Sequence, residues 1–219
     1  TRLMVSEIEI GSEKLRTGKL EPHEWVQLEE KIKPLEKAKI FIDDTAAITL
    51  TELRAKCRSL KMQHGIKLII IDYLQLMSGS ADTKNSREQE VSQISRGLKA
   101  IAKELNVPVI ALSQLNRSLE ARQDKRPQLS DLRESGAIEQ DADIVIFIHR
   151  PERYLSFNEK DSYENKGETE IIIAKHRNGA VTSVNLRFID HLAKFVDADA
   201  PVVYDDVSTV SYTHLRAHE

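Results

Sequence analysis

The sequence predicts an α/β protein with a mostly parallel central sheet and a C-terminal β-hairpin. Two apolar runs, residues 68–71 and 109–112, each end in polar residues, a pattern typical of strands buried on both faces of a parallel sheet. Amphipathic helical patterns precede and separate these runs, as in β-α-β units. Asn178-Gly179 lies between two later apolar segments and predicts a hairpin turn.

The composition excludes several classes of protein. The 219 residues are 40% hydrophobic and 31% charged, which suits one folded domain, expected over residues 1–200. A net charge of −3 gives no general attraction to nucleic acid, so any such binding must come from local patches. The single cysteine excludes an intramolecular disulfide framework and a zinc-binding spacing. Without a long apolar run or a signal peptide, we expect a cytoplasmic protein with no membrane partner.

The first 39 residues are expected to be helical. Residues 2–19 predict a helix and a turn around Gly11 or Gly18. Pro22 suits the first turn of a second helix, and Pro34 should end or kink it. One face of this helix carries an apolar stripe for core or interface packing: Trp25, Leu28, Ile32 and Leu35.

The next segment predicts a first β-α-β unit. Residues 40–42 are expected to form a short strand. Thr49 and Glu52 predict a capping box for the following helix, which Gly65 ends. The apolar run before Asp72 is the second strand, and the parallel crossover between the two is expected to be right-handed.

Two polar residues are expected at one edge of the sheet. Asp72 follows the first buried run, where it is either a capping or turn residue or the aspartate that holds Mg²⁺ in phosphate-loop nucleotidases. An amphipathic helix over residues 91–105 leads to the second run, which ends in Ser113-Gln114. Ligands of open α/β sheets bind at the carboxyl ends of the strands. By itself, however, Gln114 is more typical of a surface loop.

The remaining sequence carries basic residues at two places. Residues 115–141 form a long polar connection whose basic cluster, residues 122–126, predicts either a phosphate-facing loop or a solvated one. After a strand at residues 144–148, a strand at 170–175 leads to the Asn-Gly turn. Lys175 and Arg177 therefore lie at a hairpin tip, where they increase solubility or deliver cations to a phosphate.

Four segments together resemble the C-terminal motor domain of the DnaB-type bacterial replicative helicases. They are LIIIDYLQLM at 68–77, PVIALSQL at 108–115, SDLRESGAIEQDAD at 130–143 and AKHRNG at 174–179. Their order and spacing agree with that family from about residue 2 to residue 188. The third segment is the most specific to the family, whereas the first is shared by all RecA-like motors.

This resemblance implies a RecA-like three-layer fold in a ring-shaped homo-hexamer. The implied activity is ATP hydrolysis with Mg²⁺ that drives 5'-3' translocation on single-stranded DNA and unwinds duplex at the replication fork. Primase and a helicase loader are the implied partners.

The resemblance also implies roles for individual residues at the ATP site. Asp72 matches the Mg²⁺-associated Walker B residue, and Gln114 matches the residue that senses the γ-phosphate. Lys175 and Arg177 match the cations offered to the phosphates of a neighbouring subunit's ATP.

A second group of residues matches the family's inner-channel loop, which contacts the DNA backbone: Arg133, Glu134 and Gly136. An arginine can pair with a phosphate, and a glycine allows close approach of the backbone. Phosphate contacts carry no base information, which suits a motor that is blind to sequence.

The chain departs from the family pattern in two respects. No G-x-x-x-x-G-K-[ST] phosphate loop occurs in it, and the family's water-activating glutamate would lie before Thr1. We therefore expect an N-terminally truncated fragment that is inactive alone. Residues 201–209 are expected to be a tail, and residues 210–219 match the translation of a common sequencing adapter.

Two alternatives remain open at the level of sequence. One is a RadA-like recombination ATPase, which also has a Lys-x-Arg element after a late strand, although the 130–143 segment argues against it. The other is a non-catalytic DNA-binding paralogue that lost its phosphate loop.

Overall fold

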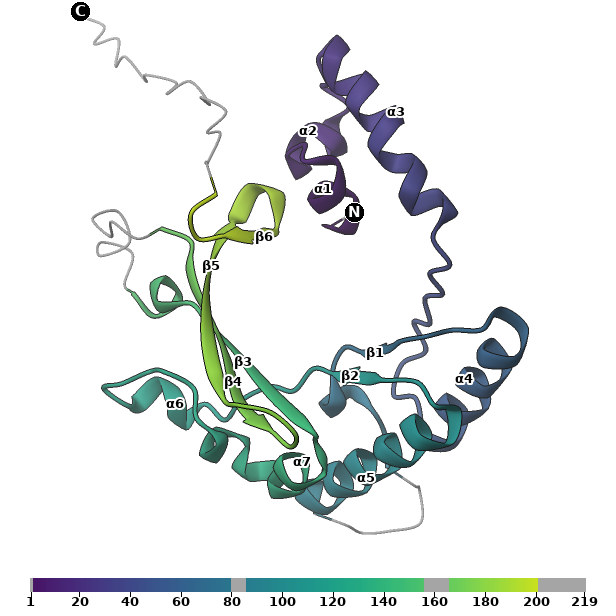
Figure 1. The fold of residues 1–219 in the computed structure, drawn as a ribbon, viewed down its shortest axis with the longest axis vertical. Helices are drawn as coiled ribbons and strands as arrows, with labels where there is room; N and C mark the ends of the chain where they lie inside the picture. The colour runs from purple at the N-terminus through teal and green to yellow at the C-terminus, as the bar shows by residue number, and fades with distance from the viewer. Residues whose placement is uncertain (1, 80–85, 156–165, 201–219) are drawn as a thin grey trace, which may run out of the picture.

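The fold is a mixed α/β arrangement, described for residues 2–79, 86–155 and 166–200 in a computed structural model (Figure 1). In chain order its elements are α1 (Arg2–Ile8), α2 (Ser12–Thr17), α3 (Pro22–Lys37), α4 (Leu50–His64), β1 (Ile69–Ile71), η1 (Leu74–Leu76), α5 (Arg87–Leu105), β2 (Val109–Ala111), α6 (Ser118–Ala121), η2 (Leu129–Ser135), α7 (Gly136–Asp141), β3 (Ile144–His149), η3 (Pro151–Tyr154), β4 (Glu168–His176), β5 (Thr182–Ile189), η4 (Asp190–Leu192) and β6 (Lys194–Asp197). The elements labelled η are 3₁₀ helices. Within the described ranges, every helix is too short or too polar to cross a membrane.

The two apolar runs form a parallel pair of strands, as the sequence predicts. Ile69 of β1 lies opposite Val109 of β2, and Ile71 lies opposite Ala111. α5 connects the strands, so the β-α-β unit of the structure is β1–α5–β2. The outer face of this pair is uncovered by the described residues, because Ile70 is 62% exposed and Ile110 is 50% exposed.

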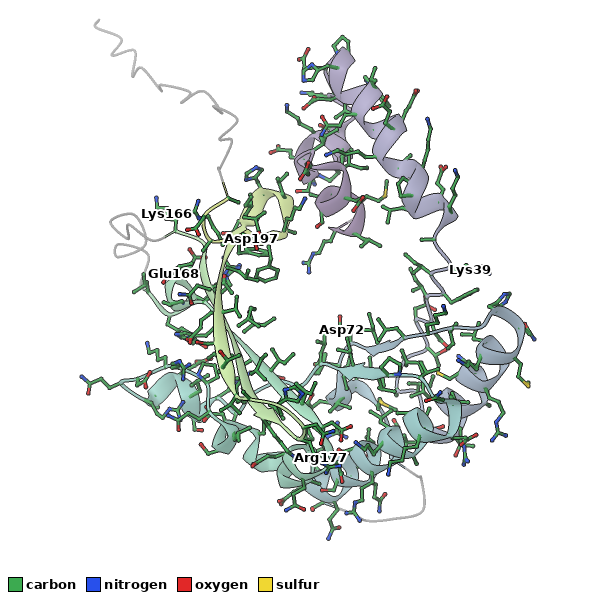
Figure 2. All side chains as sticks on the ribbon, in the orientation of Figure 1. Lys39, Asp72, Lys166, Glu168, Arg177 and Asp197 are labelled. Atoms are coloured by element: carbon green, nitrogen blue, oxygen red, sulfur yellow. The ribbon has the colours of Figure 1, made fainter. Side chains whose placement is uncertain are left out.

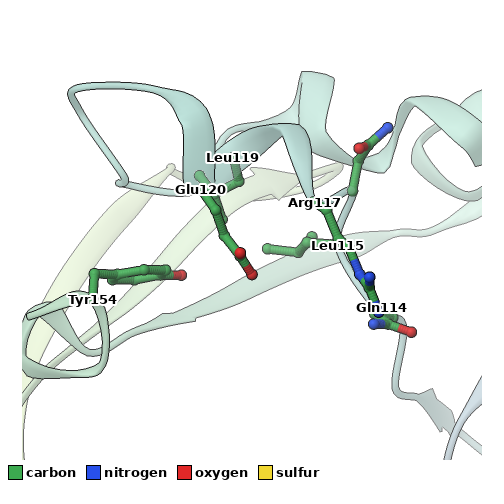
Figure 3. Close-up of a pocket in the computed structure, with 7 residues that line it drawn as sticks. Gln114, Leu115, Arg117, Leu119, Glu120 and Tyr154 are labelled. Atoms are coloured by element: carbon green, nitrogen blue, oxygen red, sulfur yellow. The ribbon is translucent and has the colours of Figure 1, made fainter. Parts of the chain in front are cut away.

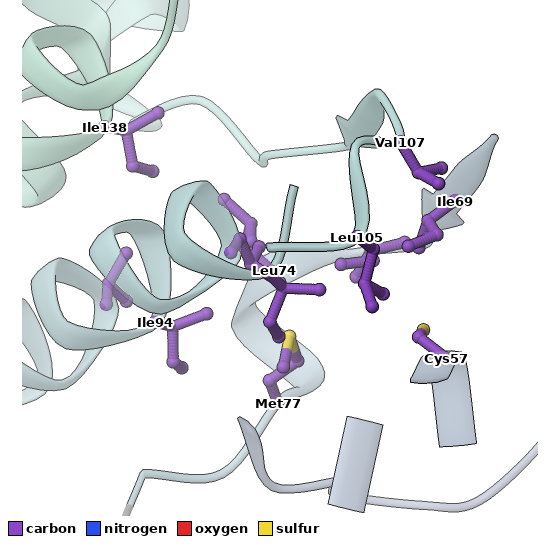
Figure 4. Packing of buried hydrophobic residues seen from close by; sticks show 12 residues of the cluster. Cys57, Ile69, Leu74, Met77, Ile94, Leu105, Val107 and Ile138 are labelled. Atoms are coloured by element: carbon purple, nitrogen blue, oxygen red, sulfur yellow. The ribbon is translucent and has the colours of Figure 1, made fainter. Parts of the chain in front are cut away.

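The inner face of β1 packs on the main hydrophobic core (Figure 4). The core consists of Cys57, Ile69, Ile71, Leu74, Met77, Val91, Ile94, Leu98, Ile101, Leu105, Val107 and Ile138. Five of these residues come from α5 and follow the stripe predicted for that helix. Burial of this stripe against β1 fixes the strand that carries Asp72 at its end.

The expected strand at residues 40–42 is absent, so the first predicted β-α-β unit is wrong. This segment runs as an extended link between α3 and α4 (Figure 1). Ile42 is 89% exposed, and no described strand pairs with residues 40–42. A three-residue apolar run without a neighbouring strand gains no ladder hydrogen bonds and does not persist as a strand.

The expectation of a mostly parallel sheet is also corrected. β3, β4, β5 and β6 form a four-stranded sheet in that order, and every neighbouring pair in it is antiparallel. Residues 177–181 connect β4 to β5, and residues 190–193 connect β5 to β6. Connections this short cannot make the crossover that a parallel pair requires.

The predicted C-terminal hairpin is present as β4 and β5. The Asn178-Gly179 turn lies between them, and the returning strand covers the residues that alternate in the sequence. A Cβ atom at Gly179 would lie 2.3 Å from atoms of the His176 ring. Glycine is therefore needed at this turn because the imidazole packs against it.

The N-terminal helices form a separate group in which α1 packs against α3 (Figure 1). Pro34 lies inside α3, which continues to Lys37, so the expectation that it ends the helix is wrong. Trp25, expected in the packing stripe, is 48% exposed. Glu24 is buried in its place and accepts a hydrogen bond of 2.6 Å from Lys14 Nζ.

The predicted ends of α4 and α5 are observed. Thr49 and Glu52 form a capping box at the start of α4, and Gly65 ends it in the left-handed conformation. Ser86 and Gln89 form an equivalent box at the start of α5. These caps satisfy backbone N–H groups that have no partner within the helix.

Candidate nucleotide and DNA site

The carboxyl ends of β1 and β2 bring Asp72 and Gln114 to the same edge of the parallel pair. Leu112 N–H donates to Ile71 O over 2.9 Å, and Leu74 N–H donates to Leu112 O over 2.9 Å. These bonds keep the two chains side by side just beyond the strands. Asp72 and Gln114 are both exposed there, so their side chains are available to a ligand (Figure 2).

A single exposed aspartate suits the Mg²⁺ that the family resemblance implies. The described residues contain no group of three or more His, Cys, Asp or Glu side chains that could hold a metal. Mg²⁺ bound with a nucleotide needs no such group, because one or two carboxylates, waters and substrate phosphates complete its shell. Asp72 therefore fits the ion as one protein ligand among ligands supplied by substrate and water.

Gln114 also borders two cavities. One has a volume of about 390 Å³ and extends past Arg117 and Glu120 to Tyr154 (Figure 3). The other has a volume of about 320 Å³ and lies toward Gln75 and the start of α5. The side chain at the end of β2 thus faces open space on two sides.

Lys175 and Arg177 lie away from Asp72 in the same chain. Figure 2 shows Arg177 at the tip of the β4–β5 hairpin, at a distance from Asp72 at the end of β1. Lys175 Nζ donates to the backbone oxygens of Glu139 and Gln140 at the end of α7. The fold therefore does not gather the four predicted ATP-site residues into one site within a single chain.

Arg177 is held by Asp143, which lies between α7 and β3. Its guanidinium is 3.2 Å from the Asp143 carboxylate, and its backbone N–H donates to Asp143 O over 2.9 Å. Lys99 of α5 also pairs with this carboxylate. The hydrogen bond from Lys99, together with the charges of Lys99 and Arg177, lowers the pKa of Asp143.

The predicted DNA-contacting residues lie where η2 meets α7. Arg133 and Glu134 belong to η2, and Gly136 is the first residue of α7. Their side chains lie outside the described part of the structure. The buried side chains of Leu132 and Ile138 flank this junction and anchor it in the fold.

Ion pairs within the chain occupy two arginines of the basic cluster at residues 122–126. Arg122 pairs with Asp131 at 2.9 Å, and that aspartate is only 5% exposed. Arg126 makes two hydrogen bonds to the Glu170 carboxylate, at 2.7 and 2.8 Å. These contacts fix the loop, and they show that the arginines have a structural role besides any contact with phosphate.

Gln75 and Arg87 contact this region and were not expected to take part in it. The Gln75 side chain hydrogen-bonds the backbone of Gln114, and Arg87 donates to Gln75 O over 2.5 Å. Neither residue stands out in the sequence. A glutamine three residues after an aspartate has no recognisable pattern, so only the folded structure reveals the contact.

Comparison with known proteins identifies the fold and the family. A family model described as DnaB-like helicase C terminal domain matches residues 1–197. A solved helicase-type ATPase domain is 42% identical, with a TM-score of 0.81, over 90% of this chain and 68% of that one. A solved DnaB-like replicative helicase, described with its interactions with primase, has the same identity and TM-score over 90% of this chain and 46% of that one.

Curated relatives give the same result. The chain is 56% identical to the replicative DNA helicase DnaB of Geobacillus stearothermophilus and 52% identical to the replicative DNA helicase DnaC of Bacillus subtilis (strain 168). Each match covers 90% of this chain and 42% of the relative, so the chain spans less than half the length of these proteins. The chain belongs to the DnaB-like helicase C-terminal domain family.

Proposed function

We propose that the chain is part of the ATP-driven motor of a replicative DNA helicase, which moves 5'-3' along single-stranded DNA and unwinds duplex. The observation that carries this proposal is the placement of Asp72 and Gln114 at one edge of the parallel pair in a chain of this family. Ligands of parallel α/β sheets bind at this edge.

In this motor, Asp72 holds Mg²⁺ and Gln114 senses the γ-phosphate of ATP. The ion neutralises charge on the phosphates and orients them for attack by water. A carboxylate and an amide at the ends of adjacent strands can serve these two functions, because one ligand can contact both.

Lys175 and Arg177 act on the ATP of a neighbouring subunit in a homo-hexamer. Their position at the tip of the β4–β5 hairpin, apart from Asp72, supports a role across an interface rather than within one subunit. Their charge stabilises the charge that develops on the transferred phosphoryl group.

Arg133, Glu134 and Gly136 contact the backbone of the single-stranded DNA. The junction of η2 and α7 presents these residues together, and buried neighbours hold it in place. Contacts to phosphate rather than to bases allow translocation on any sequence.

The complete motor has the three-layer RecA-like fold, with a larger parallel sheet than the pair described here. Exposed Ile70 and Ile110 on the outer face of β1 and β2 support this, because buried parallel strands have both faces covered. A primase and a helicase loader are its partners in the cytoplasm. One solved relative is described with its interactions with primase.

Substitution of Asp72 in the complete protein tests the proposed function. We expect wild-type protein to hydrolyse ATP with Mg²⁺ and unwind a forked duplex, and Asp72→Asn to lower turnover by about a thousandfold or more. Asp44→Asn, which changes an exposed aspartate on the link between α3 and α4, is the matched control. Full activity of Asp72→Asn, or an inactive wild type, contradicts the proposal.

A further inference from the structure

The side chain of Gln75 links the segment after Asp72 to the end of β2. Its Nε2 donates to Ser113 Oγ over 3.1 Å and to Gln114 O over 3.4 Å. Its Oε1 accepts a hydrogen bond of 3.3 Å from Gln114 N–H. One amide group thus engages both the donor and the acceptor of the Gln114 backbone, although the two residues lie 39 positions apart.

These contacts begin where the backbone pairing of the two chains ends. The last backbone bonds between them join Leu112 to Ile71 and Leu74. Beyond this point η1 turns away, and no described backbone group pairs with Gln114 N–H. The Gln75 amide takes the place of a strand neighbour there, because it presents an acceptor and a donor to the same residue.

Gln75 is itself held from the other side by α5. Arg87 in the first turn of this helix donates to Gln75 O over 2.5 Å and pairs with Glu90. Glu90 accepts a hydrogen bond of 2.8 Å from Gly79 N–H, and this bond and the Arg87 contact lower its pKa. Both ends of the segment that carries Gln75 are therefore tied to one helix.

The arrangement borders the cavity of about 320 Å³ that Gln114 also lines. The Gln114 side chain is exposed, and the cavity lining includes Gln75, Arg87 and Ser113. The Gln75 contacts leave that side chain free to reach a ligand, because they engage only the backbone of Gln114. The polar contacts that fix the end of β2 thus leave its functional group available.

We propose that Gln75 is a positioning residue that holds the backbone of Gln114 so that its side chain meets the γ-phosphate in a reactive geometry. This inference rests on the proposed ATPase function of the complete protein. Loss of the amide frees Gln114 N–H and C=O, and the backbone beyond Leu112 then samples several conformations. A displacement of about 1 Å in a catalytic group can lower a rate by about a hundredfold.

A double-mutant cycle in the complete protein tests this role. The variants are Gln75→Ala, Gln114→Ala and both together, with Gln63→Ala as the control. Gln63 is an exposed glutamine on α4 whose side chain hydrogen-bonds Ser59 of its own helix. The measurements are kcat and KM for ATP with saturating single-stranded DNA, and melting temperature for each variant.

We expect Gln75→Ala to lower kcat by about tenfold to a hundredfold with little change in KM. Gln114→Ala is expected to lower kcat by about a hundredfold. The double variant should equal Gln114→Ala alone, because a residue that acts through Gln114 has no further effect once that side chain is gone. Gln63→Ala should match the wild type.

Conservative substitutions add a second readout. Gln75→Glu keeps an acceptor for Gln114 N–H but loses the donor to Gln114 O, so its kcat should lie between those of wild type and Gln75→Ala. Gln75→Asn keeps the amide on a side chain one methylene shorter and should resemble Gln75→Ala.

Two outcomes overturn the inference. Additive losses in the double variant show that Gln75 acts independently of Gln114. Wild-type kcat in a folded Gln75→Ala protein shows that the amide contact does not position the site. An inactive wild type is a different result, because it contradicts the proposed function itself rather than the role of Gln75.

Discussion

The cations at the hairpin tip, Lys175 and Arg177, already have partners within their own chain. Lys175 caps the carbonyl end of α7, and Arg177 pairs with Asp143. The Arg177–Asp143 pair is half exposed on both sides. An exposed ion pair of this kind contributes little to stability, so its exchange for a phosphate of a neighbouring subunit is not costly.

Replacement of Arg177 tests its action across a subunit interface. In the complete protein we expect Arg177→Ala to spare ring assembly and ATP binding but to lower turnover by about a thousandfold. Assembly is measured by analytical ultracentrifugation, and turnover by steady-state ATPase assay. Arg16→Ala on α2 is a matched exposed control and should leave turnover unchanged.

Mixed rings decide whether Arg177 acts within its own subunit. Subunits with Arg177→Ala and subunits with Asp72→Asn should each be nearly inactive alone. In mixed rings, some interfaces pair an intact Asp72 with an intact Arg177 from the neighbour, so partial ATPase activity should return. No recovery in rings proven to be mixed means that Arg177 does not act in trans.

Arg133 gives a separate test of the DNA-contacting loop. We expect Arg133→Ala in the complete protein to weaken binding of single-stranded DNA equally for all base compositions. The slope of log affinity against log salt should fall by about 0.7, because one phosphate contact is lost. An unchanged slope combined with a new sequence preference contradicts the phosphate-contact role.

Among the elements, the loop between α6 and η2 is tied to β4 by Arg126 and Glu170. The pair is bidentate, a geometry in which both hydrogen bonds strengthen together. The hydrogen bond from Arg126 lowers the pKa of Glu170 from 4.5 to about 2. This loop precedes the predicted DNA-contacting residues, so the pair also helps to position them.

The Arg126–Glu170 pair predicts a pH-dependent contribution to stability. Because the folded-state pKa of Glu170 is depressed, the contribution is present above pH 4.5 and is lost as the pH falls through about 2. We expect the isosteric variant Glu170→Gln to lower the free energy of unfolding by about 1 kcal/mol at pH 7. Urea unfolding should show this difference shrink as the pH is lowered from about 4.5.

A control separates this effect from general charge effects. Glu29→Gln removes a carboxylate from an exposed position of α3 and should change stability by less than about 0.5 kcal/mol at either pH. A difference for Glu170→Gln that stays constant from pH 7 to pH 2.5 contradicts the role of the ion pair.

For the whole molecule, the chain contains only part of what an ATPase site needs. The parallel edge presents Asp72 and Gln114, but the 219 residues hold no G-x-x-x-x-G-K-[ST] loop. Such a loop supplies backbone N–H groups and a lysine that bind the phosphates. We therefore expect the 219-residue chain alone to show no significant Mg²⁺-dependent turnover of ATP in a steady-state assay. Hydrolysis that Asp72→Asn abolishes would show that the chain has a complete ATP site of its own.

Several elements were predictable because their signals are local. The core stripe of α5, the capping box at Thr49 and Glu52, and the hairpin around Asn178-Gly179 depend on residues a few positions apart. Residues 40–42 were misjudged because an apolar run becomes a strand only beside another strand. The parallel content was overestimated for a related reason, since the sequence does not state which strands are neighbours.

The sequence by itself determined the family and the candidate residues of the site, because short motifs in a fixed order are independent of how the chain folds. It also determined that Asp72 and Gln114 share an edge, since successive parallel strands end on the same side. Only the tertiary structure decided which groups these residues meet. The Gln75 amide on Gln114, Asp143 on Arg177 and Glu170 on Arg126 join residues 34 to 44 positions apart, and such pairs depend on how the elements pack.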